Sequence, residues 1–152
     1  MLEALREAKK AYLKDEVPVG AVIVKDGKII ARAHNKKEEK NQATRHAEIE
    51  VIEKASKKLN NWYLSDCDLY VTFEPCLMCC GAIINSRIDS VYFGAYDYKY
   101  GCCGSIMNVL TDNRFNHHPT CKGGILEKEC SKILTEFFQN KRQEKKELKK
   151  WK

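Results

Sequence analysis

Two short segments of the chain carry side chains that bind and activate metal ions. His46 and Glu48 stand two residues apart in the first, and Cys76 and Cys79 form a Cys-x-x-Cys pair after Pro75 in the second. At the start of a helix, such a pair places two sulfurs on one turn, where the helix N-terminus favours the thiolate. Zinc prefers sulfur and imidazole ligands, and a catalytic zinc site leaves its fourth position to water. The two segments therefore predict a zinc site with three protein ligands and one open position.

Glu48 is the residue that could move protons at such a site. It follows His46 by two residues, so it can face the water on the metal without binding the metal itself. Cys80 is a rival ligand, but it lies roughly 100° round the helix from Cys79, so only one of the two can face the ion. The Cys-x-x-Cys spacing selects Cys79, and we interpret Cys80 as a packing residue.

Simpler interpretations of these residues exist. A lone His at a helix start is commonly a surface or capping residue, and a lone Cys-x-x-Cys is either a metal site or a redox motif. The joint occurrence of both segments, with a glutamate at the right offset and a proline before the first Cys, favours a catalytic metal site. Further cysteines and histidines match no zinc spacing, and we interpret them as packing or loop residues: Cys102, Cys103, Cys121, Cys130, His117 and His118.

The composition is that of an ordinary globular protein. The chain has 152 residues, of which 32% are charged and 43% hydrophobic, and these values predict a single domain over residues 1–152. Apolar stretches fall short of the about eighteen residues of a membrane span, and the N-terminus lacks the apolar core of a secretion signal. We therefore expect a cytoplasmic protein without a membrane partner, whose eight cysteines bind metal or are buried rather than form disulfides.

The positive charge is concentrated at one end of the chain. The net charge is +6, and residues 141–152 hold seven Lys or Arg against two Glu, a net +5. A concentrated basic segment favours a polyanionic partner, because it neutralises phosphates and releases counterions. The other interpretation is a solvated helix end that keeps the protein in solution, and the composition alone does not choose between them.

Hydrophobic periodicity and turn residues predict alternating strands and helices, which favour a three-layer α/β/α sandwich. Pro75 fits the first position of a helix, where its missing N–H is no loss. We expect helices over 1–13, about 46–58, 76–85, a short 106–110 and about 127 to the end. We expect strands over 19–24, 28–33, 68–72, 90–93 and 124–126, with a hairpin turn at Asp26-Gly27 and loops over 35–45 and 94–105.

The chain resembles the cytidine-deaminase superfamily, and within it the bacterial tRNA-specific adenosine deaminases. The zinc deaminases share the signature H-x-E…P-C-x-x-C, which this chain carries. The resemblance covers nearly the whole chain and rests on these further segments: 16–22, Asn35, 46–49, 70–72, 74–76, 93–95, 104–105, 116–117, 124–126 and 137–138.

The resemblance implies a fold, an activity and a set of site residues. The fold would be a five-stranded mixed sheet between helices, in a homodimer. The activity would be conversion of adenosine to inosine at the wobble position of a tRNA anticodon loop, with no DNA partner. His46, Cys76 and Cys79 would hold one zinc ion, Glu48 would be the acid and base, and Asn35 would contact the flipped base.

Two alternatives stay open. The zinc signature does not separate an RNA deaminase from a deaminase of a free base or nucleoside, such as cytosine, cytidine or guanine; the basic tail and the breadth of the resemblance favour RNA. The second alternative is non-catalytic, a zinc-stabilised RNA-binding module or an inactive partner subunit. Glu48 argues against it, since an inactive protein has no need of that carboxylate, and so does the lack of a fourth zinc ligand at a sensible spacing.

Overall fold

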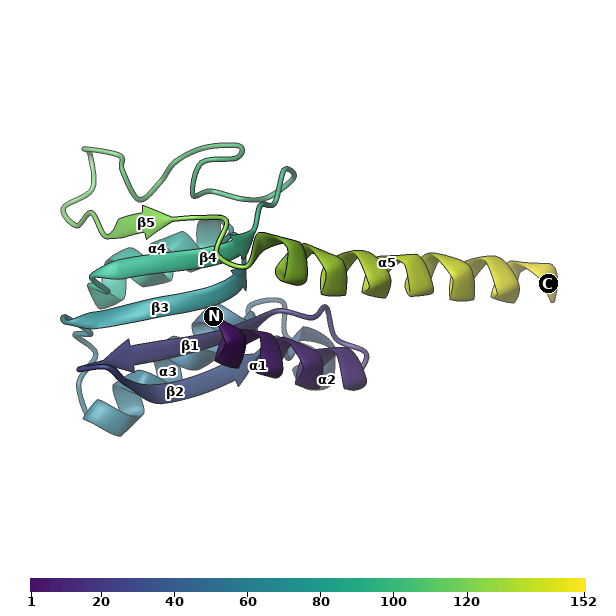
Figure 1. Ribbon diagram of the computed structural model, residues 1–152, viewed down its shortest axis with the longest axis horizontal. Coiled ribbons are helices and arrows are strands. Elements are labelled where there is room, and N and C mark those ends of the chain that lie inside the picture. Colours follow the sequence, from purple (N-terminus) through teal and green to yellow (C-terminus); the bar gives the residue numbers. More distant parts are fainter.

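The structure is a computed structural model that describes residues 1–152, and it forms three layers (Figure 1). The strands are β1 (Gly20–Lys25), β2 (Lys28–His34), β3 (Cys67–Phe73), β4 (Ser90–Ala95) and β5 (Thr120–Lys122). The helices are α1 (Leu2–Leu13), α2 (Lys37–Lys40), α3 (Ala47–Leu59), α4 (Leu77–Ser86) and α5 (Glu127–Lys150). The expected α/β architecture with a five-stranded mixed sheet is confirmed.

The five strands lie in the order β2-β1-β3-β4-β5. β1 pairs antiparallel with β2 and β3, whereas β3–β4 and β4–β5 are parallel. The predicted turn at Asp26-Gly27 joins β1 to β2, with Lys25 opposite Lys28 and both turn residues at positive φ, as a tight two-residue hairpin requires. As a result, the carboxyl ends of β2, β3 and β4 meet at one edge of the sheet, beside the beginning of β1.

Helices cover both faces of the sheet, with α1 and α5 on one face and α3 and α4 on the other (Figure 1). α3 buries Ala47, Val51 and Ala55, whose small side chains at four-residue spacing let the helix lie close to β1 and β2. α1 also lies close to β1, because Gly20 has no side chain: a Cβ there would lie 2.0 Å from the Ala4 carbonyl oxygen.

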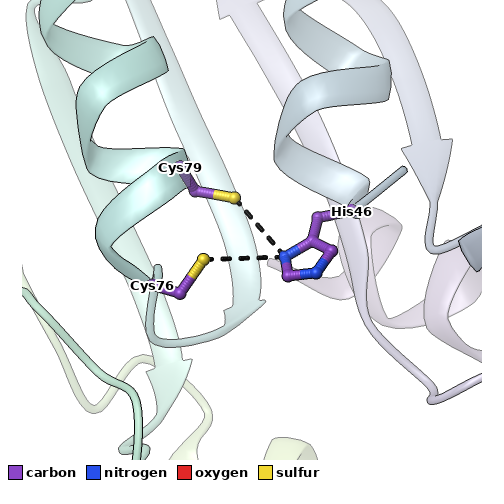
Figure 2. A group of neighbouring side chains, drawn as sticks. All are labelled: His46, Cys76 and Cys79. Carbon is purple, nitrogen blue, oxygen red and sulfur yellow. Dashed lines mark hydrogen bonds between the residues drawn. The ribbon is translucent and has the colours of Figure 1, made fainter. Parts of the chain in front are cut away.

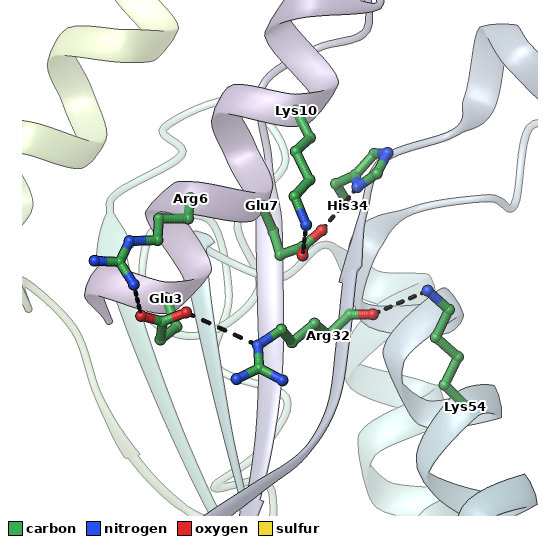
Figure 3. Close-up of polar contacts among 7 residues, drawn as sticks. All are labelled: Glu3, Arg6, Glu7, Lys10, Arg32, His34 and Lys54. Atoms are coloured by element: carbon green, nitrogen blue, oxygen red, sulfur yellow. Dashed lines mark hydrogen bonds and ion pairs between the residues drawn. The ribbon is translucent and has the colours of Figure 1, made fainter.

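α1 is also joined to β2 by a buried polar cluster (Figure 3). The Glu7 carboxylate contacts Nδ1 of His34 at 2.9 Å and Nζ of Lys10 at 2.7 Å. A second contact between the same two elements joins Arg32 on β2 to Glu3 of α1 at 3.8 Å. A buried carboxylate needs such partners, since an unpaired buried charge is costly.

Several sequence-based expectations about the elements are wrong. Residues 106–110 form no helix, because Ile106 and Val109 donate their N–H groups back to the loop, to the carbonyls of Gly101 and Cys102. The fifth strand lies at Thr120–Lys122 rather than 124–126, where Gly124 and Leu126 have positive φ.

Two smaller differences concern helix starts and the loop after β2. The loop over 35–45 contains one helical turn, α2, which ends at Asn41 in the left-handed conformation. Pro75 lies just before the helix cap rather than at the first helical position, because Cys76 is the N-cap of α4. The first difference involves a single helical turn and the second a shift of one residue, so the layers of the fold stay as expected.

α5 extends well beyond the sheet, and its C-terminal half projects away from the rest of the molecule (Figure 1). Cys130, Leu134 and Phe137 are its buried residues, and all lie in its first half. The basic residues of 141–152 are on the projecting half, exposed except for Lys141. None of the helices combines the length and apolar character needed to cross a membrane.

Candidate active site

Two helix starts bring the candidate ligands together. His46 is the N-cap of α3 and Cys76 is the N-cap of α4, both with extended backbone, and Cys79 lies in the first turn of α4. α3 and α4 are neighbours on one face of the sheet, and their N-terminal ends lie next to each other. The expectation that both motifs sit at helix starts is confirmed.

The three candidate ligand atoms face one another (Figure 2). Nδ1 of His46 lies 3.7 Å from Sγ of Cys76 and 3.7 Å from Sγ of Cys79, and the three atoms all lie within 4.8 Å of one another. Tetrahedral zinc, with bonds of about 2.0–2.3 Å to nitrogen and sulfur, separates two such ligand atoms by roughly 3.6 Å. The spacing and the donor types therefore fit a zinc ion.

The protonation of the two thiols reflects their closeness. A hydrogen bond from the Cys79 thiol, aided by His46 and opposed by burial, lowers the pKa of Cys76 to about 4. The same hydrogen bond, together with burial, raises the pKa of Cys79. One thiolate therefore forms readily beside one thiol, and a divalent cation at this place favours loss of the second proton as well.

A cavity of about 410 Å³ opens beside the three ligands. His46 and Cys76 line it together with Glu48 and Asn35, so the two other predicted site residues reach the same space. Glu48 is only 4% exposed, and burial raises the pKa of its carboxyl to about 7, against the opposing effects of a backbone hydrogen bond and His46. A carboxyl with a pKa near neutrality suits both gain and loss of a proton.

The cavity wall adds apolar side chains from distant parts of the chain. Val17 and Val19 come from the segment before β1, Phe73 from β3 and Phe138 from α5. These side chains make part of the wall beside the candidate metal site apolar, as is common in small-molecule sites.

Glu16 is a site residue that the sequence analysis missed. It is fully buried, and its carboxylate accepts hydrogen bonds from the Glu39 N–H at 2.6 Å and from Nδ2 of Asn35 at 3.3 Å. It thereby ties the segment before β1 to the loop after β2 and orients the Asn35 amide. No local pattern marks this role, because its partners lie 19 and 23 residues away.

Glu74 is a second missed residue. Its buried carboxylate accepts backbone N–H groups of Cys103 and Ser105 at 3.2 Å each, and of Asp97 at 3.4 Å. Gly101 lets the loop approach it, since a Cβ there would lie 2.1 Å from Oε2 of Glu74. Glu74 thus holds the loop after β4 in place beside the cavity.

The other cysteine of the adjacent pair, Cys80, is buried away from the candidate ligands. Its sulfur lies 3.5 Å from Sγ of Cys103 and contacts the backbone carbonyls of Pro75 and Cys102. Cys80 therefore packs under the loop after β4, whereas Cys79 faces His46. This arrangement agrees with the preference for Cys79 as the ligand.

Known proteins with similar sequences and structures identify the family. The family model of the MafB19-like deaminases matches residues 1–142. A tRNA-specific adenosine deaminase of Bacillus subtilis (strain 168) is 51% identical over 150 residues, which cover 99% of this chain and 93% of the relative. The fold and the site define a deaminase with the cytidine-deaminase-like fold. More narrowly, the chain belongs to the family of tRNA-specific adenosine deaminases, and the resemblance found in its sequence is confirmed.

Solved structures agree with this membership. One, from work on A-to-I editing by tRNA:A34 deaminases at the wobble position of transfer RNA, has a TM-score of 0.85 and 45% identity, and the match covers 88% of this chain and 97% of that one. A guanine deaminase from Bacillus subtilis has a TM-score of 0.60 and 42% identity over 62% of this chain and 61% of that one. The fold is therefore shared by deaminases of different bases.

Proposed function

We propose that this protein hydrolyses adenosine to inosine and ammonia at the wobble position of a tRNA anticodon. The observation that carries the proposal is the group of His46, Cys76 and Cys79 at the wall of a cavity that also contains Glu48. Membership of the tRNA-specific adenosine deaminase family supports the choice of substrate.

His46, through Nδ1, and the two sulfurs of Cys76 and Cys79 would hold one zinc ion. When bound, zinc supplies Lewis-acid activation, which lowers the pKa of a water molecule enough for it to react at neutral pH. Three ligands leave room for that water. The thiolate of Cys76, whose pKa is already low, gives the site its first negative charge.

Glu48 carries the protons in the proposed reaction. Its carboxylate takes a proton from the attacking water while the water oxygen bonds to C6 of adenine, and it delivers this proton to N1. Glu48 then moves the proton of the new hydroxyl group to the exocyclic nitrogen. The C6–N bond breaks, and ammonia leaves with the bond's electron pair, so water and adenosine give inosine and ammonia.

Asn35 is the proposed contact for the flipped base. Its Oδ1 accepts the Lys37 N–H at 3.4 Å, while Nδ2 donates to Glu16 and to the Val17 carbonyl. A side chain held from both ends is already oriented before the base arrives, which reduces the cost of binding. The base must leave its stack to reach the cavity, and an anticodon loop allows this more cheaply than a duplex.

We also propose that residues 1–152 act as one deaminase domain, in a homodimer, in the cytoplasm. The support for the dimer is the likeness to the family, and the support for the compartment is the proposed tRNA substrate. Sedimentation at several protein concentrations measures whether the protein is a dimer. A chain that stays monomeric at the concentrations where it is active contradicts the dimer.

The alternative is a deaminase of a free base or nucleoside, which would use the same cavity and the same Glu48. The protein with zinc is incubated separately with a tRNA transcript that has adenosine at the wobble position and with adenosine, cytidine, cytosine and guanine. We expect ammonia and inosine from the transcript alone. Activity on a free base or nucleoside without activity on the transcript overturns the proposal.

A further inference from the structure

The loop after β4 exposes three tyrosines at alternate positions, Tyr96, Tyr98 and Tyr100. Tyr98 is 80% exposed and Tyr100 is 68% exposed, whereas most large apolar side chains of the preceding strand are buried. Exposed aromatic rings concentrated on one loop mark an interaction surface rather than part of the core.

Tyr98 is exposed, but one face of its ring packs against Tyr96. The rings of Phe93, Tyr96 and Tyr98 form a series that we call the aromatic ladder. Phe93 is buried in the core at 1% exposure, and Tyr96 meets it edge-on at 5.1 Å between ring centroids. Tyr98 stacks on Tyr96 at 6.5 Å with the planes 20° apart, which leaves the other face of Tyr98 to solvent.

The ladder depends on a close approach of the chain at Gly123. A Cβ at Gly123 would lie 2.3 Å from the Phe93 ring and 2.9 Å from the Tyr96 ring. The glycine that follows β5 therefore leaves the space in which these two rings meet. The outer ring of the ladder is thus connected to the core through packed side chains.

The backbone of the loop is also held in place. Oδ1 of Asp97 accepts the N–H groups of Lys99 at 3.0 Å and Tyr100 at 3.1 Å, and the Asp97 carbonyl accepts the Gly101 N–H at 2.9 Å. Asp97 in turn donates its own N–H to Glu74. This tight turn holds the backbone on both sides of Tyr98 in place, so less of the chain has to be ordered when a partner binds.

The turn is next to the cavity. Asp97 and Tyr100, on either side of Tyr98 and Lys99 in the chain, line the same cavity as Glu48 and His46. A partner whose reacting group enters the cavity therefore passes this turn. The turn presents a flat aromatic face and the ammonium group of Lys99, and these suit a nucleobase and its phosphate.

We propose that Tyr98, supported by Tyr96, stacks against an unpaired nucleobase that neighbours the target adenine in the RNA. The inference rests on the proposed function, since it takes an anticodon loop as the substrate. A single-stranded loop offers unstacked neighbours on both sides of the flipped base, and stacking on an aromatic ring recognises any base through its π face. The net +5 of residues 141–152 is complementary to the phosphates of the same RNA.

The test uses an RNA hairpin that carries an anticodon loop with adenosine at the wobble position. The fluorescent base 2-aminopurine replaces the neighbour on one side or the other, because its emission is quenched when it stacks on an aromatic ring. Tyr98→Leu keeps an apolar side chain but removes the ring, and Tyr98→Phe keeps the ring. Tyr63→Leu is the matched control, because Tyr63 is also exposed but follows the end of α3 that is far from His46.

We expect Tyr98→Leu to raise KM for the hairpin about fivefold to tenfold, as the loss of one base–aromatic stack predicts. We expect its kcat to stay within about twofold of wild type, since the ring acts in binding. Quenching at one of the two neighbour positions is lost in Tyr98→Leu, kept in Tyr98→Phe and unchanged in Tyr63→Leu.

Different results would contradict the role of Tyr98 and the proposed deaminase function. The inference is overturned when Tyr98→Leu has the KM and quenching of wild type, or when Tyr63→Leu changes them equally. The proposed function is overturned when the wild-type protein with zinc binds the hairpin but forms no inosine. Quenching is measured in binding titrations without turnover, so the role of Tyr98 is decided in either case.

Discussion

At the scale of single residues, the site brings one buried carboxylate next to three candidate ligands. Their types and spacing were sufficient to select His46, Cys76 and Cys79, because few other roles require a His and a Cys-x-x-Cys at two helix starts. The roles of Glu16 and Glu74 were not predictable. Each carboxylate accepts N–H groups from a loop about 20 or more residues away, and no local sequence pattern records such a contact.

Glu48→Gln tests the proton carrier. Glutamine has nearly the same shape as glutamate, but it neither takes nor gives a proton at neutral pH. We expect the variant to keep its metal and to lose about 10²- to 10⁴-fold in turnover, the usual contribution of a general acid and base. Inosine formation and metal content are measured on the same samples. Turnover within about threefold of wild type contradicts this role for Glu48.

Adjacent cysteines provide a matched pair for the metal site. Cys79→Ser removes a sulfur that faces His46, whereas Cys80→Ser changes a sulfur that faces Cys103. We expect purified wild type and Cys80→Ser to carry about one zinc ion per chain, and Cys79→Ser to carry much less. Metal analysis after dialysis measures this. Equal zinc loss in both variants contradicts the assignment of Cys79, rather than Cys80, as the ligand.

At the scale of elements, the close contact of α1 with β1 depends on Gly20. Gly20→Ala forces a Cβ against the backbone of α1, at 2.0 Å from Ala4 O and 2.4 Å from Ala8 N. We expect the free energy of unfolding to fall by about 1–3 kcal/mol, as for other overpacked sites. Urea unfolding measures it.

Gly81→Ala is the control for this substitution. Gly81 lies inside α4, and a Cβ there meets no atom within 4 Å. Alanine is a better helix former than glycine, so we expect stability to rise by about 0.5–1 kcal/mol. The same effect of both substitutions on stability would show that α1 does not need a glycine at position 20.

The Glu7–His34 contact makes stability depend on pH. Burial raises the pKa of the Glu7 carboxyl, but hydrogen bonds and charges from Lys10 and His34 outweigh it, and the pKa lies below its ordinary 4.5. A lowered pKa means that the ionised carboxylate stabilises the fold above the unfolded value. That stability is lost as the pH falls from the unfolded value through the folded one.

Glu7→Gln should therefore unfold more easily at pH 7, by about 1–3 kcal/mol, and should lose less further stability between about pH 5 and pH 3. Urea unfolding across that range measures both effects. Glu3→Gln on the same helix is the control, because its partners Arg6 and Arg32 form surface contacts. We expect it to cost about 0.5 kcal/mol or less. A Glu7→Gln curve parallel to wild type refutes the assignment.

The elements were predictable where periodicity was strong. The alternation of strands and helices, and the hairpin at Asp26-Gly27, follow from local residue types. β5 was placed wrongly because its three residues are polar or half-buried and are held by parallel pairing with Ser90–Tyr92, a long-range contact. Residues 106–110 were expected to form a short helix. They belong instead to an irregular loop in which Glu74 binds the N–H groups of Cys103 and Ser105, and Val109 and Leu110 are buried there.

At the scale of the whole molecule, we propose that the cavity and the projecting half of α5 bind the same RNA. Phe138 on α5 lines the cavity, and the basic residues of the same helix follow directly after it. Neutralising lysines on the projecting half should weaken RNA binding and flatten its dependence on salt. The four to be changed to Gln together are Lys145, Lys146, Lys149 and Lys150.

We expect the slope of log K against log salt to become shallower by about 0.7 for each of these lysines that contacts a phosphate. Binding of the hairpin at several salt concentrations measures the slope. The control variant changes four other lysines to Gln and should leave the slope unchanged. Two flank the β1–β2 turn and two lie in the last turn of α3, far from His46 at its start: Lys25, Lys28, Lys57 and Lys58. Equal slopes in the two quadruple variants refute a role for the projecting helix.

The most direct measurement of the central claim is sequencing of a tRNA pool before and after incubation with the zinc-loaded protein. Inosine is read as guanosine, so adenosine at the first anticodon position should change to guanosine in the reads, and Glu48→Gln should leave the pool unchanged. If the tRNA pool stays unchanged while the same wild-type protein deaminates a free base or nucleoside, the protein is not a tRNA deaminase.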